Sequence, residues 1–214
     1  MKKIKKILSV ASAAVLCAMP IVNVAPVNAS GSPQMKTYVV YSVATRPDIA
    51  YFDYTLYYSD SVIFQESKPS SLLSKGNFSS IPKTSNRKVQ HKYSGSTIGS
   101  RGEVVATKFI VSMDTESIYD KISRTTPDIR NANGVTLSPT SLIMDDILLG
   151  DVDFNGIVDN DDADLILSHI VNPDNYPFTE KQFQAADVYN QGDGITGMDA
   201  YTIQQYVAKI ISHF

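Results

Sequence analysis

The chain has 214 residues, a formal net charge of −3, a single cysteine and no tryptophan. Its lysines cluster only among the first six residues, which argues against a nucleic-acid-binding protein. A chain of this length suits one or two small domains.

The N-terminus has the pattern of a secretory signal peptide, expected to span residues 1–29. Four lysines among the first six residues precede an apolar stretch over 7–24, and the small residues Val27 and Ala29 mark a cleavage site. No stop-transfer pattern follows, so we expect no membrane span in the mature protein. The signal peptide predicts a secreted, extracellular protein. Cys17, the only cysteine, lies inside the signal, so the mature protein should be free of disulfides.

Residues 30–148 have the pattern of a β-protein. Residues 38–43 are rich in β-branched and aromatic side chains, and 49–58 and 104–111 alternate between two faces. The segment 67–88, rich in Ser, Gly and Pro, should separate strands. Short strands at this spacing predict a β-sandwich.

The pattern changes near residue 149. Residues 150–214 hold eleven acidic and two basic side chains, whereas 30–149 hold eleven and thirteen. An acidic block with a regular pattern suggests bound cations. Helical runs over 162–171 and 199–211 each follow an Asp/Asn/Gly-rich loop, so the segment contains a duplicated unit.

The first acidic loop, 151–162, has the spacing of an EF-hand calcium loop, with Gly156 at the sharp turn. Its last position is aspartate where such loops usually carry glutamate. A polar turn without metal is the alternative. The expected ligands are the side chains of Asp151, Asp153, Asn155, Asp159 and Asp162 and the carbonyl of Ile157.

The second acidic loop, 187–199, is one residue longer, which blurs its ligand register. The alternative is again a turn without metal. We expect ligands from Asp187, Asn190, Asp193 and Asp199, and hence a second Ca²⁺ site.

The doubled loops, with phrases such as Ile195-Thr-Gly-Met-Asp-Ala200, resemble the dockerin family over 149–214. The resemblance implies a small all-α module of two EF-hand-like loop–helix repeats that needs calcium to fold. It also implies binding to a cohesin module of a scaffoldin within a cellulosome. The implied contact residues are Asn160, Asp161, Leu165, Ser168 and His169 in the first repeat and Gly197, Met198, Tyr201 and Gln205 in the second.

A weaker resemblance links residues 35–146 to the cohesin family, through the aromatic–Asp–aromatic run at 49–58 and the strand after Gly102. It implies an adaptor scaffoldin that receives a dockerin-bearing partner, with Tyr51 and Tyr57 on the contact face. The expected fold class is therefore multi-domain, with an all-β sandwich followed by an all-α dockerin.

Two alternatives stay open for the β-region. Tyr51 and Tyr57 would also suit a carbohydrate-binding platform. A small polysaccharide-active enzyme would need paired carboxylates, and Asp53, Glu66, Glu103 and Asp114 lie in no catalytic motif. We therefore expect no catalysis.

Overall fold

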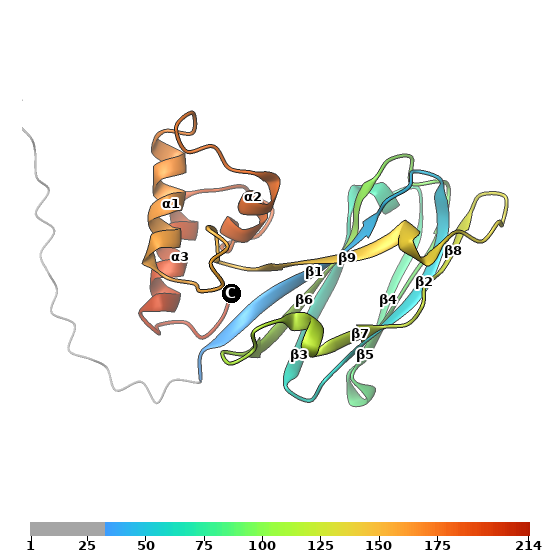
Figure 1. The fold of residues 1–214 in the computed structure, drawn as a ribbon, viewed down its shortest axis with the longest axis horizontal. Coiled ribbons are helices and arrows are strands. Elements are labelled where there is room, and N and C mark those ends of the chain that lie inside the picture. Colours follow the sequence, from blue (N-terminus) through green and yellow to red (C-terminus); the bar gives the residue numbers. More distant parts are fainter. Residues whose placement is uncertain (1–32) are drawn as a thin grey trace, which may run out of the picture. The chain divides into compact units, whose positions relative to one another are not determined.

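The computed structural model describes residues 33–214, which belong to one compact unit (Figure 1). The expected signal peptide lies outside the described residues. No helix within 33–214 is long and apolar enough to cross a membrane.

Within the described residues, nine strands form two antiparallel sheets. The first sheet has the order β3 (Val62–Pro69), β6 (Gly102–Ser112), β1 (Met35–Ala44) and β9 (Leu142–Leu148). The second has the order β4 (Gly76–Lys83), β5 (Lys88–Gly95), β2 (Ile49–Tyr58) and β7 (Ile122–Arg124), and β8 (Asp128–Asn131) also pairs with β2. Short 3₁₀ turns lie at Ser71–Leu73, Thr84–Asn86, Ile118–Asp120 and Pro139–Ser141.

The alternation in β2 fixes which side of the second sheet faces the core. Phe52, Tyr54 and Leu56 are buried, whereas on the other face Tyr51 is half-buried and Tyr57 is exposed. Because side chains alternate along a strand, this confirms the strand and the two faces predicted from the sequence. Phe109 of β6 packs into the same core from the first sheet.

The predicted separator at 67–88 was wrong in part, because it contains β4 and the end of β3. Both strands lie at the edges of their sheets. An edge strand packs few side chains into the core, and β4 buries mainly Phe78 between exposed Asn77 and Ser79. Its hydrophobic alternation is therefore weak.

The expectation of a multi-domain chain that ends in an all-α module of two EF-hand-like repeats is also wrong. The described residues are mostly β-sandwich, with three short helices near the end: α1 (Asn160–Val171), α2 (Glu180–Ala186) and α3 (Gly197–Val207). α2 is an additional helix between the two loops. The small core of this C-terminal helical region (149–214) includes Val39 of β1, so the region shares its core with the sandwich.

α2 also links the C-terminal helical region to the outer face of the first sheet. Lys181 forms an ion pair with Asp145 of β9 at 2.6 Å, and Gln184 donates a hydrogen bond to Glu103 of β6 at 2.7 Å. Val39 and Tyr41 of β1 pack against the region from the same face. The helices therefore cover part of the first sheet and leave the second sheet free of them.

His91 of β5 is fully buried between the sheets. Its Nε2 lies 2.8 Å from the Ser67 hydroxyl, and its ring stacks on Phe78. Nδ1 is buried and has no hydrogen-bond partner among the described residues. Burial lowers the pKa of His91 to about 4, because a charged imidazolium is poorly solvated there.

Stability should therefore fall when the solution is acidified. A depressed histidine pKa means that the unfolded chain binds more protons, so this contribution is complete above pH ~6.5 and is lost towards pH ~4. Between pH 7 and pH 4.5 the loss from His91 alone should be roughly 2–3 kcal/mol, at about 1.4 kcal/mol per pH unit. We expect urea unfolding in constant calcium to show this loss in the wild type and a smaller one in His91→Gln. Equal losses in the two proteins would contradict the assignment.

Candidate functional site

Asp162 closes the first acidic loop. Its side chain is fully buried at the start of α1. Oδ1 accepts hydrogen bonds from the backbone N–H groups of Val152 and Asp153, at 2.7 and 3.2 Å, and Oδ2 accepts one from Asp159 at 2.9 Å. One carboxylate thus ties the beginning of the loop to the helix that follows it, in a capping box.

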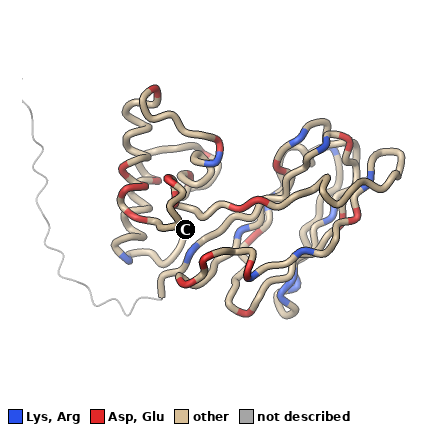
Figure 2. The backbone as a smooth tube through the Cα atoms, viewed as in Figure 1, with Lys and Arg blue, Asp and Glu red and all other residues tan. Residues whose placement is uncertain are grey.

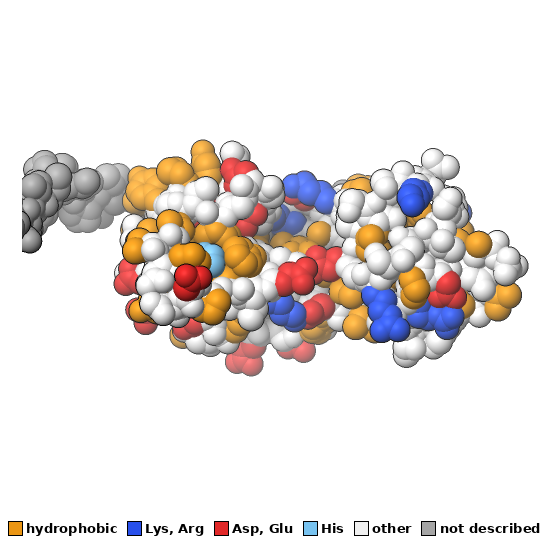
Figure 3. Space-filling model, turned by 90° about the horizontal axis from the view of Figure 1, so that it is seen from above, with side chains coloured by type: hydrophobic (Ala, Val, Ile, Leu, Met, Phe, Trp, Pro, Cys, Tyr) orange, Lys and Arg blue, Asp and Glu red, His pale blue; other side chains and the backbone are white. Residues whose placement is uncertain are grey.

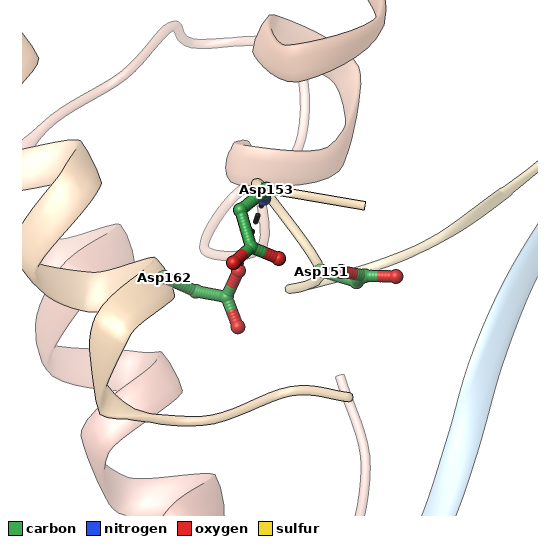
Figure 4. Close-up of side chains that lie close together, drawn as sticks. All are labelled: Asp151, Asp153 and Asp162. Atoms are coloured by element: carbon green, nitrogen blue, oxygen red, sulfur yellow. Dashed lines mark hydrogen bonds between the residues drawn. The ribbon is translucent and has the colours of Figure 1, made fainter. Parts of the chain in front are cut away.

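Asp151 supplies a second buried carboxylate. Its Oδ2 accepts a hydrogen bond from Gly156 N at 3.0 Å, whereas its Oδ1 is buried with no hydrogen-bond partner among the described residues. Each of Asp151, Asp153 and Asp162 offers an oxygen within 4.8 Å of the others (Figure 4). An unpartnered buried oxygen beside two more carboxylates is unfavourable unless a cation is present.

The electrostatics of the loop also favour a bound cation. Burial raises the pKa of Asp162 to about 6, and the Asp153 carboxylate adds to the rise. Burial also raises the pKa of Asp151. No basic side chain within residues 33–214 offsets the charge of these carboxylates, and acidic side chains are frequent in the helical region (Figure 2).

The other predicted ligands of this loop lie beside the cluster. Asn155 donates to Asp153 Oδ2 at 3.0 Å, and its Oδ1 accepts from Ile157 N at 2.7 Å. The Asp159 carboxylate accepts from Asp161 N at 2.9 Å and caps α1. All the predicted metal ligands in the loop are oxygen atoms, which suits a hard cation such as Ca²⁺.

The second acidic loop has the same hydrogen-bond pattern. Asp199 is fully buried, and its Oδ1 accepts from Val188 N and Tyr189 N at 3.0 and 2.9 Å. Asp187 Oδ2 accepts from Gly192 N at 2.7 Å, and its Oδ1 is buried without a hydrogen-bond partner in the described structure. Asp187 and Asp199 therefore correspond to Asp151 and Asp162.

The backbone locates the extra residue of the second loop. Phe154 and Asn190 both adopt positive φ, 62° and 54°, and a positive-φ glycine follows two residues later in each loop. The two loops are therefore in the same register up to Gly192, and the insertion follows it. Asn190 corresponds to Phe154, and Gln191 corresponds to the expected ligand Asn155.

Sequence reasoning missed Gln191, although counting forward from Asp187 to Gly192 would have found it. Asp193 lies in the stretch that holds the insertion and is exposed. Tyr189 stands where the first loop has Asp153. The second loop thus offers Asp187, Asp199 and Gln191 as oxygen ligands in register with the first. The predicted ligand Asp193 is also near them, because burial raises the pKa of Asp187 and the Asp199 and Asp193 carboxylates add to the rise. The second loop has fewer carboxylates than the first.

The predicted contact residues on the helices differ in accessibility. Tyr201 and Met198 are exposed, Leu165 packs at the edge of the small core, and Ser168 and Gln205 are half-buried. Asn160, Asp161 and Gly197 lie exposed where α1 and α3 begin.

His169 is held by aromatic side chains of the segment after α1. Its ring stacks on Phe178 at a centroid distance of 4.1 Å, and its Nδ1 lies 2.7 Å from the Tyr176 carbonyl oxygen. Exposed Leu167, Val171 and Tyr176 lie around the same end of α1 and were not predicted. Hydrophobic side chains are prominent on the helical region in Figure 3.

Tyr51 and Tyr57 share the outer face of the second sheet with basic side chains. Lys92 and Arg130 lie over the Tyr51 ring, at 5.6 and 5.2 Å from its centroid, and Lys88 lies 5.7 Å from that of Tyr57. Cation–π contacts of this kind fix the rings and surround them with positive charge.

No protein-family model matches the chain, and no curated protein matches it. A non-cellulosomal cohesin from the archaeon Archaeoglobus fulgidus is 14% identical, covers 50% of this chain and 75% of its own, and has a TM-score of 0.41. The structure of the sixth cohesin of Acetivibrio cellulolyticus scaffoldin B in complex with a Cel5 dockerin mutant is 16% identical. This match covers 50% of this chain and 84% of that one, with a TM-score of 0.39.

A third solved structure, of the third ScaB cohesin of R. flavefaciens in complex with a group 1 dockerin, contains a chain that is 35% identical; the match covers 29% of this chain and 90% of that one, with a TM-score of 0.28. All three titles name cohesins, and two of them also name a dockerin. TM-scores below 0.5 do not by themselves establish a shared fold.

The register of the second loop is testable. Gln191→Ala should weaken calcium binding at the second site about ten-fold, because it removes an oxygen donor at the position of Asn155. Asn190→Gly keeps the positive φ and should have a smaller effect. Two-site calorimetric titration of both variants makes the comparison. A larger loss in Asn190→Gly than in Gln191→Ala would show that Asn190 is the ligand.

Proposed function

We propose that this chain is a secreted, non-catalytic assembly component with two protein-binding surfaces. Its C-terminal helical region binds a cohesin-type partner when calcium fills the two acidic loops. The β-sandwich binds a second, dockerin-bearing protein through the outer face of its second sheet. The observation that carries the proposal is the buried, unpartnered Asp151 Oδ1 within a cluster of three carboxylates.

Calcium would act by neutralising charge that the fold buries. Asp162 and Asp199 form the capping boxes with which α1 and α3 begin. In these positions each lies close to the other carboxylates of its loop. A divalent cation coordinated by Asp151, Asp153 and Asp162 replaces their mutual repulsion with attraction. The helices would then present Tyr201 and Leu167 in a fixed arrangement.

The partner classes come from the family resemblances of the two segments. In the titles of the solved structures, cohesins form complexes with dockerins. An adaptor scaffoldin combines the two roles in one chain, so that a dockerin-like end joins a scaffold and a cohesin-like end receives another protein.

Two cation–π contacts of Tyr51 favour a protein partner over a carbohydrate. Sugar rings stack on open faces of aromatic side chains, but Lys92 and Arg130 both lie over the Tyr51 ring. A tyrosine flanked by two cations suits an acidic protein surface.

Calcium should stabilise the chain. At a concentration 100 times its dissociation constant, a ligand that binds only the folded state adds about 2.7 kcal/mol. Thermal unfolding should therefore have a higher midpoint in calcium than in chelator. Asp162→Asn should reduce the difference and Asp164→Asn, on the exposed side of α1, should not. Equal midpoints in calcium and chelator for the wild type would contradict calcium binding.

The two surfaces should be separable by mutation. Tyr51→Ala with Tyr57→Ala should weaken binding of a dockerin-bearing partner ten-fold or more, since a buried interfacial tyrosine contributes roughly 1–3 kcal/mol, and should leave cohesin binding intact. Tyr201→Ala, on α3, should weaken cohesin binding and leave binding of the dockerin-bearing partner intact. Surface plasmon resonance with both partners tests each variant. Loss of both partners in either variant would contradict two independent surfaces, provided the melting temperature is unchanged.

A further inference from the structure

The outer face of the second sheet is positively charged around an aromatic centre. The strand register places Lys92 opposite Asp53 and Lys88 opposite Tyr57, and continues to Lys83 on β4. Asp53 accepts a hydrogen bond from Gln90 at 2.7 Å, and Asp128 is paired with Arg130. The lysines of this face thus have no ion-pair partner on it among the described residues, and exposed Tyr57 and Ile81 lie between them.

The end of α1 has the opposite character. Leu167, Val171 and Tyr176 are exposed, and Val171 is 83% exposed. Asp164 lines the same shallow surface, and exposed Asp174 follows α1. This acidic apolar surface complements the basic aromatic face in charge, and each has an apolar centre. In Figure 3, basic side chains are prominent on the sandwich and hydrophobic ones on the helical region.

The two surfaces cannot meet within one molecule. The C-terminal helical region is attached to the first sheet, through the Lys181–Asp145 ion pair and the small core around Val39. The basic face is the outer side of the second sheet, on the other side of the sandwich. Any contact between the two surfaces must therefore join different molecules.

We propose that a second copy of this chain docks the acidic apolar end of its α1 on the basic face of the second sheet. The inference rests on the proposed function, since it names the chain itself as one partner of the sandwich face. The contact is heterologous, so repeated docking produces open chains, or closed rings if the rotation allows. Because charge complementarity drives it, association should weaken as salt increases.

Charge-reversal variants test this contact in the full chain with calcium. Sedimentation velocity of the wild type should show assemblies larger than a monomer. These should dissociate as NaCl is raised from about 50 to about 500 mM, because salt screens the charges on the two surfaces. Lys88→Glu with Lys92→Glu should raise the dissociation constant about ten-fold or more, as should Asp164→Lys with Asp174→Lys. Each double variant places like charges on both of its surfaces.

An equimolar mixture of the two double variants should assemble again, because each altered surface then meets one of opposite charge. Lys75→Glu with Arg101→Glu changes the net charge equally, at exposed positions outside both surfaces, and should associate like the wild type. A wild type that stays monomeric at 200 µM, about twenty times a moderate 10 µM affinity, overturns the self-association. So does failure of the mixture to assemble.

Binding of a dockerin-bearing protein to the sandwich separates the two ideas. If the wild type binds that protein but stays monomeric, the self-association is wrong and the proposed function stands. If it binds neither that protein nor itself, and the melting curve shows a folded chain, both are wrong.

Discussion

The C-terminal helical region depends on two buried carboxylates, Asp162 and Asp199. Each accepts backbone hydrogen bonds from the beginning of its loop and from the residue that caps the following helix. The same two side chains thus fix the loop closure and the start of α1 and α3. Beside them, Asp151 Oδ1 and Asp187 Oδ1 are buried with no hydrogen-bond partner among the described residues, and a bound divalent cation is the simplest compensation that a set of oxygen ligands allows.

This constraint extends into the β-sandwich. The loops position Val152 and Val188 in the small core, where they meet Ile166 of α1, Ile203 of α3 and Val39 of β1. The helical region is therefore joined to the first sheet by shared apolar packing and by the contacts of α2. Cation binding in the loops should thus support the orientation of the helices relative to the sandwich, and with it the separation of the two proposed binding surfaces.

The sequence could predict those parts of the structure that have a local signal. Alternation predicted β2 and its buried face, and loop spacing predicted Asp151, Asp162, Asp187 and Asp199, which the structure places at equivalent ends of the two loops. The edge strand β4 gave little signal because it buries few side chains. The packing of residues 149–214 against β1 could not be predicted, since contacts such as that of Tyr206 Oη with the Met35 carbonyl, 171 residues apart, have no local pattern.

Native mass spectrometry of the folded full chain in calcium tests the central claim most directly. The account predicts that two calcium ions remain bound per chain, that Asp151→Ala retains one, and that Asp151→Ala with Asp187→Ala retains none. A compact wild-type chain that retains no calcium would contradict it, because the buried carboxylates would then be tolerated without a cation.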